Sequence, residues 1–135
     1  MTYIDCYLVP VPRKNKAAYE ELARISESVV KEHGALRVVE CWLDESGPDV
    51  TTYHGADARL EPERYATFRR AAGASDQEAV VMSFVEWPNK DARDRGMERV
   101  TRDPRMQFAG LPPVFEGARL IAGGFLPMLD SRREA

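Results

Sequence analysis

Two glutamates stand beside tryptophans near the ends of apolar runs, and they are the residues best placed to do chemistry. Glu40 lies two positions before Trp42, and Glu86 directly precedes Trp87. If strand pairing brings both carboxylates onto one face, each raises the pKa of the other, which suits an acid–base pair. The alternative is that each pairs with a nearby arginine near the end of its strand. We take Glu40 and Glu86 as the candidate catalytic residues.

A second group of side chains is suited to holding a ligand. Asp5 lies between Tyr3 and Tyr7 in a strand-like run, and a buried carboxylate needs a partner, either a ligand or a salt bridge across a dimer seam. Arg105 could grip a carboxylate or phosphate, or tie a helix end to the next loop. We expect a pocket between sheet and helices, with these candidate ligand-binding residues: Asp5, Tyr7, Trp42, Phe84, Trp87 and Arg105.

The remaining chemistry-bearing residues argue against a metal or a tightly bound cofactor. His33 precedes Gly34 at the end of a predicted helix, where a structural role competes with that of a base. His54 lies in a long loop and is either solvated or part of a lid. Neither histidine has acidic partners at ligand spacing, and Cys6 and Cys41 form no Cys-x-x-Cys pair. We expect no metal and no cofactor.

Composition excludes several classes of partner and indicates a cytoplasmic protein. The chain has 135 residues and a formal net charge of −3, so nothing draws it to nucleic acid or an anionic membrane. No apolar run approaches the roughly 20 residues of a membrane span. The first residues lack the regions of a secretion signal. The two cysteines fit a reducing compartment.

Hydrophobic periodicity predicts four strands and two main helices in one domain, residues 1–130, with a polar tail at 131–135. The strands are expected at about 3–11, 35–44, 78–87 and 118–129, and the helices at about 16–33, capped by Asn15, and 90–102, capped by Asn89. Residues 46–64 read as an exposed loop insertion, followed by a short helix at 63–72. Gly123-Gly124 suggests a bulge or a close backbone approach.

The order of these elements predicts an α+β, ferredoxin-like β-α-β-β-α-β fold with an antiparallel sheet in strand order 4-1-3-2. Two helices cover only one face of such a sheet. Yet the strand at 78–87 is apolar on both faces: Val80, Met82 and Phe84 on one, Val81, Val85 and Trp87 on the other. A second copy is the simplest cover. We therefore expect a homodimer with the two sheets face to face.

Several blocks resemble the bacterial family called domain of unknown function 1428. They are His33–Trp42, Phe84–Pro88, Asp103–Met106 and Gly123–Phe125, and the likeness runs from about Tyr3 to Asp130. The resemblance implies membership of the dimeric α/β-barrel superfamily, hence the fold and a homodimer. That superfamily includes cofactor-free oxygenases, isomerases, haem-handling proteins and ligand sensors. Fold analogy does not choose among them, and the family supplies no catalytic residues.

Two departures from the family pattern limit what the resemblance transfers. The segment 46–64 is longer than the usual strand connection. Residues 115–119 read Phe-Glu-Gly-Ala-Arg where the family has Phe-Asp-Gly-Lys-Arg, so no role of that lysine is carried over.

Two functions remain open from the sequence. The first is a small-molecule binder or cofactor-independent enzyme, performing proton transfer or oxidation on an apolar compound. The second is a non-enzymatic homodimer, a ligand sensor or a structural module. A well-formed cavity with convergent Glu40 and Glu86 favours the first, and a filled interior with both glutamates in salt bridges favours the second.

Overall fold

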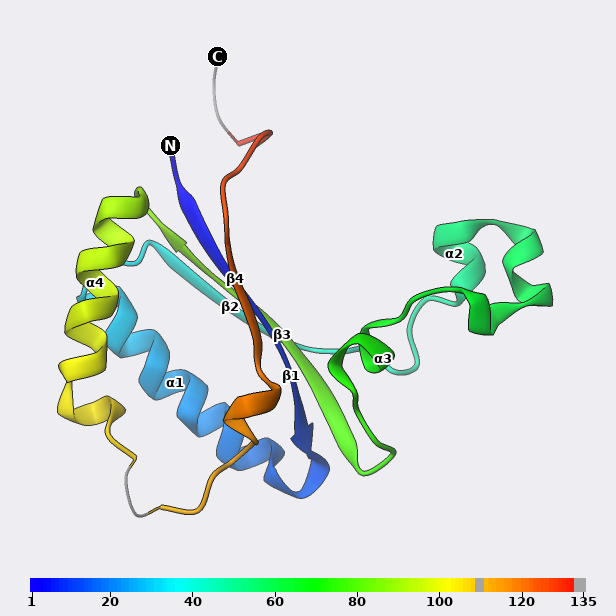
Figure 1. Cartoon of the computed structure of the whole chain (residues 1–135), viewed down its shortest axis with the longest axis horizontal. Helices are drawn as coiled ribbons and strands as arrows, with labels where there is room; N and C mark the ends of the chain where they lie inside the picture. The colour runs from blue at the N-terminus through cyan, green and yellow to red at the C-terminus, as the bar shows by residue number, and fades with distance from the viewer. Residues whose placement is uncertain (109–110, 133–135) are drawn as a thin grey trace.

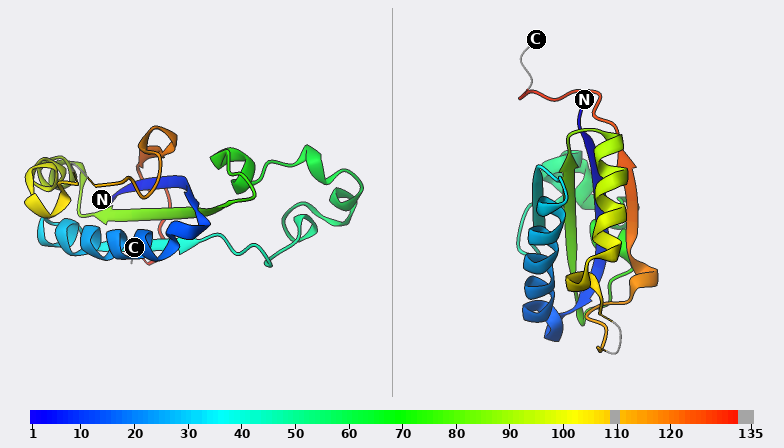
Figure 2. Two further views of the ribbon diagram at one scale, coloured as in Figure 1. Left: turned by 90° about the horizontal axis from the view of Figure 1, so that it is seen from below. Right: turned by 90° about the vertical axis from the view of Figure 1, so that its left-hand side faces the viewer.

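A four-stranded antiparallel sheet carries two helices on one face (Figure 1). The computed structural model describes residues 1–108 and 111–132. The strands run in the order β2-β3-β1-β4 and are β1 (Tyr3–Pro12), β2 (Arg37–Trp42), β3 (Glu78–Trp87) and β4 (Ile121–Phe125). α1 (Lys16–Glu32) and α4 (Lys90–Arg102) contact each other on one side of the sheet, as the right-hand view of Figure 2 shows. The predicted α+β class and strand order are confirmed.

The register of the strands decides which side chains face the helices. Tyr7 of β1 and Glu40 of β2 both lie opposite Ser83 of β3, so these three side chains share the helix side. The opposite side, which we call the open face, is not covered by α1 or α4. It carries the alternate residues Ile4, Cys6, Leu8, Val39, Cys41, Met82, Phe84, Ile121 and Phe125. Both cysteines are free there.

Trp87 anchors the core between the sheet and the helices. Its side chain is fully buried, among residues from β1, β3, α1 and α4. α4 reaches it because Gly96 has no side chain: an added Cβ would lie 2.4 Å from Trp87 Cζ3 and 2.7 Å from the carbonyl oxygen of His33. A glycine inside a helix costs about 1 kcal/mol relative to alanine, and here the close packing on Trp87 offsets that cost.

Both main helices begin where they were predicted, but only one predicted cap forms. The Asn89 side chain accepts a hydrogen bond from the backbone N–H of Ala92 at 2.7 Å. The Asn15 side chain makes no cap, because its amide nitrogen donates to the carbonyl of Val114 instead. The apolar spacing Ala18, Leu22, Ile25 and Val29 predicts an inner stripe for α1, but Ala18 is exposed and the neighbouring Tyr19 is buried.

The segment between β2 and β3 contains more structure than the predicted loop. It holds α2 (Val50–His54), 3-10 turns at Ala56–Leu60 and Pro62–Arg64, and α3 (Phe68–Ala72). The predicted helix at 63–72 is interrupted by extended backbone at Tyr65 and Thr67. Thr67 caps α3 by accepting from the Arg70 N–H. Elements this short span fewer than two turns, so periodicity does not reveal them.

The last strand is shorter than the predicted 118–129. A 3-10 turn occupies Gly117–Arg119, and pairing with β1 covers only Ile121–Phe125. The predicted close backbone approach is present at Gly124, where the Tyr3 ring lies over the strand so closely that no Cβ would fit. Within the described residues, no helix has both the length and the apolar character needed to cross a membrane.

Candidate functional site

A cavity of about 240 Å³ lies between the sheet and the two main helices. Its walls are mostly apolar, with side chains from the sheet, α1, α4 and the chain after α4. The lining residues are Tyr7, Tyr19, Leu22, Ala23, Ser26, Val30, Val38, Glu40, Ser83, Val85, Met97, Val100, Met106, Phe115 and Leu120. We call this cavity the chamber. Its position is that predicted for a pocket from the sequence.

A small set of polar groups converges on the chamber. The Tyr19 hydroxyl donates to Glu40 Oε1 at 2.7 Å, and Ser83 lies directly across from Glu40 on the neighbouring strand. Tyr7 sits beside Ser83 on the other side, in β1. The Tyr7 hydroxyl has no hydrogen-bond partner within the described part of the chain. Acceptor, donors and one unused hydroxyl therefore face a common space.

The surroundings of the chamber shift the pKa values of its ionisable groups. The pKa of Glu40 is raised, because burial disfavours the charged carboxylate; hydrogen bonding from Tyr19 and Ser83 opposes this effect. Burial, with a smaller contribution from the Asp5 charge, raises the pKa of Tyr7 to about 12. Glu40 is thus tuned toward accepting and returning a proton, and Tyr7 stays a hydrogen-bond donor at neutral pH.

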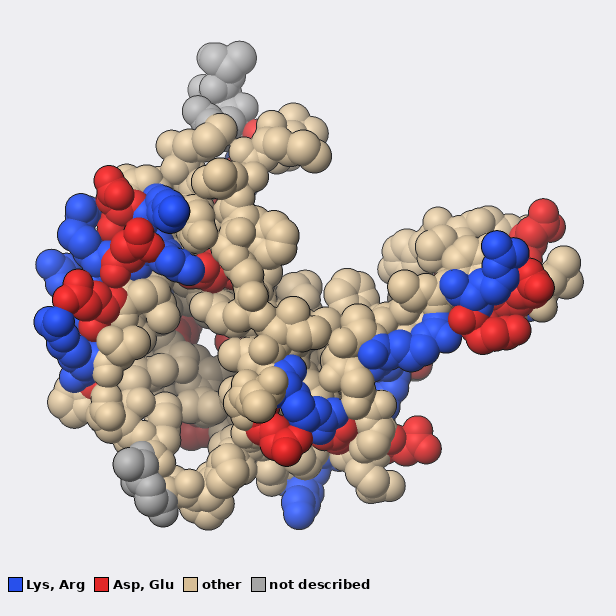
Figure 3. Space-filling view, in the orientation of Figure 1, with Lys and Arg blue, Asp and Glu red and all other residues tan. Residues whose placement is uncertain are grey.

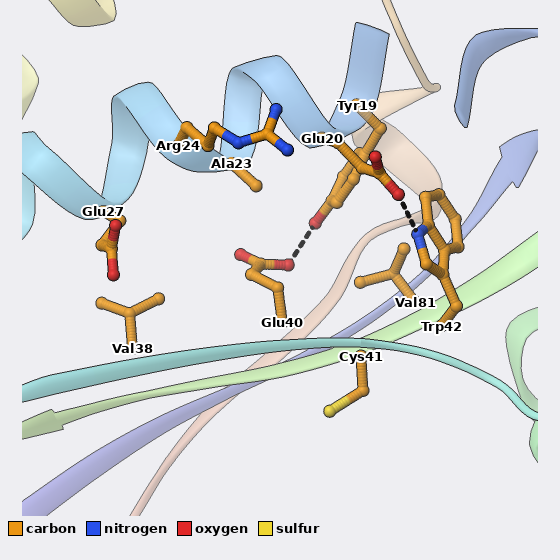
Figure 4. A pocket seen from close by; sticks show the side chains of 10 residues that line it. All are labelled: Tyr19, Glu20, Ala23, Arg24, Glu27, Val38, Glu40, Cys41, Trp42 and Val81. Carbon is orange, nitrogen blue, oxygen red and sulfur yellow. Dashed lines mark hydrogen bonds between the residues drawn. The ribbon is translucent and has the colours of Figure 1, made fainter. Parts of the chain in front are cut away.

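A second hollow, of about 370 Å³, opens outside the chamber between α1 and the edge strand β2 (Figure 4). The two spaces share Tyr19, Ala23, Val38 and Glu40. Glu40 as a whole residue is exposed on this edge, yet its carboxylate points at α1 and the Tyr19 hydroxyl, while Cys41 points the other way (Figure 4). Glu40 therefore lies in the wall that the outer hollow and the chamber share.

Trp42 frames the outer hollow rather than the chamber. Its indole N–H donates to Glu20 Oε2 at 2.8 Å, and the Lys16 ammonium lies 4.7 Å from the ring centroid. Tyr19 packs edge-on against the same ring, with centroids 5.5 Å apart. These contacts fix Trp42 in the wall of the outer hollow.

The proposed pairing of Glu40 with Glu86 is wrong. Glu86 lies opposite Ile4 and Arg37 in the register, on the open face, whereas Glu40 faces the helices. Glu86 is buried and forms a salt bridge with Arg132. Phe84 shares the open face, where the Arg37 guanidinium lies 5.4 Å from its ring centroid. Neither Glu86 nor Phe84 lines the chamber.

Asp5 and Trp87 belong to the core beside the chamber and not to its lining. Asp5 is 3% exposed. Its carboxylate accepts hydrogen bonds from Arg93 Nη2 at 3.0 Å, Arg93 Nε at 3.1 Å and the Trp87 indole at 3.2 Å. The expected partner across a dimer seam is therefore replaced by Arg93 of α4 in the same chain. This network fixes α4 on the sheet.

Arg105 and both histidines also have structural partners. Arg105 pairs with Asp103 and Glu32, joining the ends of α1 and α4 on the surface. His33 Nε2 lies 3.1 Å from Asp103 Oδ2. The His54 ring packs on Tyr65, with centroids 4.4 Å apart, in a segment that lines neither the chamber nor the outer hollow. Within the described residues, no group of three or more His, Cys, Asp and Glu side chains could hold a metal ion.

Comparison with known proteins identifies the family. Residues 2–117 match the family described as Protein of unknown function (DUF1428). The chain belongs to this family. It is 38% identical over 130 residues to the uncharacterized protein YbaA of Escherichia coli strain K12, covering 96% of this chain and 99% of that protein. Proteins of the same name from Escherichia coli O157:H7 and Shigella flexneri give the same values.

The DUF1428 assignment confirms the resemblance seen in the sequence blocks. It carries no reaction and no residue roles, so the site rests on the geometry of this chain. Position 118, where the family pattern has lysine, is an exposed alanine in the 3-10 turn. The neighbouring Arg119 pairs with Glu78 of β3 at 2.8 Å and draws the pKa of that carboxyl down to about 2. Arg119 thus ties the 3-10 turn before β4 to β3.

Sequence reasoning missed two polar residues of the chamber in this DUF1428 chain. Ser83 is the single polar residue between Ala79 and Val85 in β3, and a polar residue that interrupts an apolar strand on its helix side is a signal. Tyr19 is not evident from the sequence because the helical spacing of apolar residues in α1 favours Ala18 as the inner residue. Both contact Glu40, which the sequence had selected.

Proposed function

We propose that this protein binds a small, mostly apolar molecule in the chamber and that Glu40 moves a proton on it without a cofactor. The observation that carries the proposal is the Glu40 carboxylate. It lies in a largely apolar cavity, its pKa is raised by burial, and three hydroxyl groups surround it. An apolar pocket with a few convergent polar groups and a perturbed pKa is the common form of a small-molecule site.

The size of the chamber limits the ligand to a small molecule. A cavity of about 150 Å³ lined by apolar side chains is enough to bind benzene. The chamber, at about 240 Å³, therefore suits a single ring with short substituents. The wall of Leu22, Val30, Val85, Met97 and Val100 favours an apolar body, and the polar group of the ligand would lie near Glu40.

The chemistry that fits this arrangement is proton abstraction from carbon next to a carbonyl. The Glu40 carboxylate takes the proton, and the electron pair of the broken C–H bond moves into the carbonyl to give an enolate. The unused Tyr7 hydroxyl is suited to donate a hydrogen bond to the enolate oxygen. Where the substrate has a β,γ-double bond, the enolate extends over it as a dienolate, and return of the proton from Glu40 to the γ-carbon shifts the double bond with no external oxidant or reductant.

Deuterium exchange at carbon tests this proposal directly. A panel of single-ring ketones is incubated with the protein in D2O, and loss of the α-proton signal is followed by proton NMR. We expect exchange of at least one compound above the buffer rate, and a loss of about 100-fold or more in Glu40→Gln, since general-base catalysis contributes about 10² to 10⁴. Glu98→Gln, on the outer surface of α4, is the control and should exchange like the wild type.

The outcomes separate an enzyme from a binder. Binding of a panel compound without exchange would leave a ligand sensor and remove the catalytic role of Glu40. Exchange that persists in Glu40→Gln but is lost in Glu86→Gln would move the site to the open face. The absence of both binding and exchange for every compound of the panel would contradict the chamber as a small-molecule site.

We also propose that two copies associate through their open faces, forming a dimeric α/β barrel. Figure 3 shows charged side chains gathered on α4 and on the segment between β2 and β3, while the surface around β4 is mostly uncharged. The open face and the chain beyond β4 expose large apolar side chains, among them Met82, Ile121, Phe125, Leu126, Met128 and Leu129. A monomer seldom leaves so large an apolar patch in water, and an identical copy offers a matching one.

Native mass spectrometry at micromolar concentration tests this assembly. We expect a dimer, and Met82→Asp should shift the population to monomer because it buries a charge in the apolar centre of the interface. A wild-type protein that stays monomeric would overturn the homodimer. A dimer insensitive to Met82→Asp would move its interface away from the open face.

A further inference from the structure

The segment 46–67, which we call the arm, projects away from the sheet on the side opposite α1 and α4. Figure 1 and the left-hand view of Figure 2 agree on this placement. α2 packs extensively on the 3-10 turn beside it, and within the described part of the chain neither has an extensive contact with a strand or with α1 or α4. The arm therefore stands on the open-face side with little support from its own chain.

The arm nevertheless has a defined fold, which is stabilised by contacts among its own residues. Asp49 caps α2 by accepting from the Thr51 N–H at 2.8 Å, and Arg59 Nη2 lies 3.8 Å from the same carboxyl group. Ala58 is 1% exposed inside the arm. The stacked rings of His54 and Tyr65 close its base. A merely solvated loop has no need of such contacts.

Two large side chains of this small unit face water. Tyr53 is 72% exposed and Leu60 is 80% exposed. Tyrosine is among the residues enriched at the energetic centres of protein interfaces, and an exposed leucine beside it adds apolar area that burial would stabilise. The small interior of the arm is formed around Ala58, and neither Tyr53 nor Leu60 is buried in it. Both side chains are therefore available to contact a surface outside the arm.

The size of the open face indicates which surface the arm contacts. Four strands about 4.8 Å apart and about 20 Å long present roughly 400 Å² of flat area. A stable interface needs about 800 Å² on each partner. The strands alone fall short of this area. The rest can come from two neighbouring segments, the chain beyond β4 with its exposed apolar side chains and the arm, which projects on the same side.

We propose that the arm of each copy clasps the second copy, with Tyr53 and Leu60 as its anchors. This inference rests on the homodimer proposed above. Two-fold symmetry makes the contact reciprocal, so each partner is held by one arm and holds the other with its own. A contact with the second copy would give the long segment between β2 and α3 a role in assembly.

Photo-crosslinking in a mixture of two tagged copies tests the clasp. The photoreactive residue p-benzoylphenylalanine replaces Tyr53 in a His-tagged copy, which is mixed with a Strep-tagged copy, irradiated and purified on the second tag. We expect a cross-linked species that carries both tags. The same residue in place of Glu98, on the helix-covered side, is the control and should give none.

A dissociation constant from analytical ultracentrifugation tests the energetic contribution. Leu60→Asp should raise the dimer dissociation constant at least about tenfold, as expected for loss of an interface anchor. Tyr53→Ser should act in the same direction. Ala18→Asp, on the exposed surface of α1, is the matched control and should leave the constant unchanged. Far-UV circular dichroism checks that each variant keeps its fold.

The outcomes distinguish the clasp from the homodimer on which it rests. A wild-type dimer with an unchanged dissociation constant in Leu60→Asp, or with cross-links only inside one chain, would overturn the clasp and leave the homodimer in place. A wild-type protein that is monomeric in the ultracentrifuge would overturn both.

Discussion

Glu40 and Asp5 are both carboxylates on strands that face the helices, but their surroundings give them different roles. Asp5 has three hydrogen-bond donors and a guanidinium partner, so its charge is satisfied. Glu40 has only hydroxyl partners and no arginine or lysine paired with it among the described residues. A carboxylate without a cationic partner in a partly dry cavity is the better proton acceptor.

Replacing Asp5 tests its structural role. Asp5→Asn removes the charge that Arg93 and the Trp87 indole share, and we expect the free energy of unfolding to fall by about 3 kcal/mol, since breaking one side of a buried pair is costly. Asp94→Asn is the matched control: Asp94 also pairs with Arg93, at 2.8 Å, but is half exposed. It should cost no more than about 0.5 kcal/mol. Urea unfolding measures both, and equal effects would remove the special role of Asp5.

The raised pKa of Glu40 makes a pH-dependent difference in stability. Folded Glu40 keeps its proton to higher pH than the unfolded chain, so its ionisation destabilises the fold as pH rises from about 4 through the folded pKa. Glu40→Gln lacks this cost. We expect the variant to match the wild type at pH 4 and to be more stable at pH 8 by no more than about 0.5 kcal/mol, because the residue is partly exposed.

Urea unfolding at the two pH values measures this difference. A Glu40→Gln variant less stable than the wild type at pH 8 but equal to it at pH 4 would mean that the charged carboxylate stabilises the fold. Glu40 would then be structural and not a proton acceptor.

At the scale of elements, the chamber depends on how α1 and α4 are held over the sheet. The Asp5–Arg93 pair ties α4 to β1, the His33–Asp103 contact joins the ends of the two helices, and Gly96 lets α4 approach Trp87. These contacts lie around the chamber and not in it. A change in any of them should therefore alter the cavity indirectly, by moving a helix.

Gly96→Ala separates helix propensity from packing. Alanine favours an isolated helix by about 1 kcal/mol, but here the new methyl group would meet Trp87 and the backbone of His33. We expect a net loss of about 1 to 3 kcal/mol, the range for overpacking a core. Gly117→Ala, where nothing lies within 4 Å of an added Cβ, is the control. Thermal unfolding compares them, and a stabilised Gly96→Ala would show that α4 does not rest on Trp87 as described.

The sequence predicted the elements and the strand order at the scale of the whole chain, because strand and helix periodicities are strong in β1, β3 and α1. It did not predict whether Glu40 and Glu86 lie on the same face of the sheet. Facing depends on the register of β2 against β3, and a shift of one residue reverses it. The connection between β2 and β3 is long and its elements are too short for a periodic signal, so the sequence offers no turn from which to read that register. The register places Ser83 opposite Glu40, and the packing of α1 on the sheet brings Tyr19 to the same carboxylate.

At the scale of the whole molecule, the central feature is the chamber, which we propose as a small-molecule site with Glu40 in its wall. The most direct test is a two-dimensional NMR spectrum of isotope-labelled protein, recorded with and without single-ring ketones and phenols. We expect at least one compound to shift the signals of Tyr7, Val38, Glu40 and Ser83, with weaker binding in Glu40→Gln. Shifts confined to the open face, or none with any compound, would contradict a binding site in the chamber.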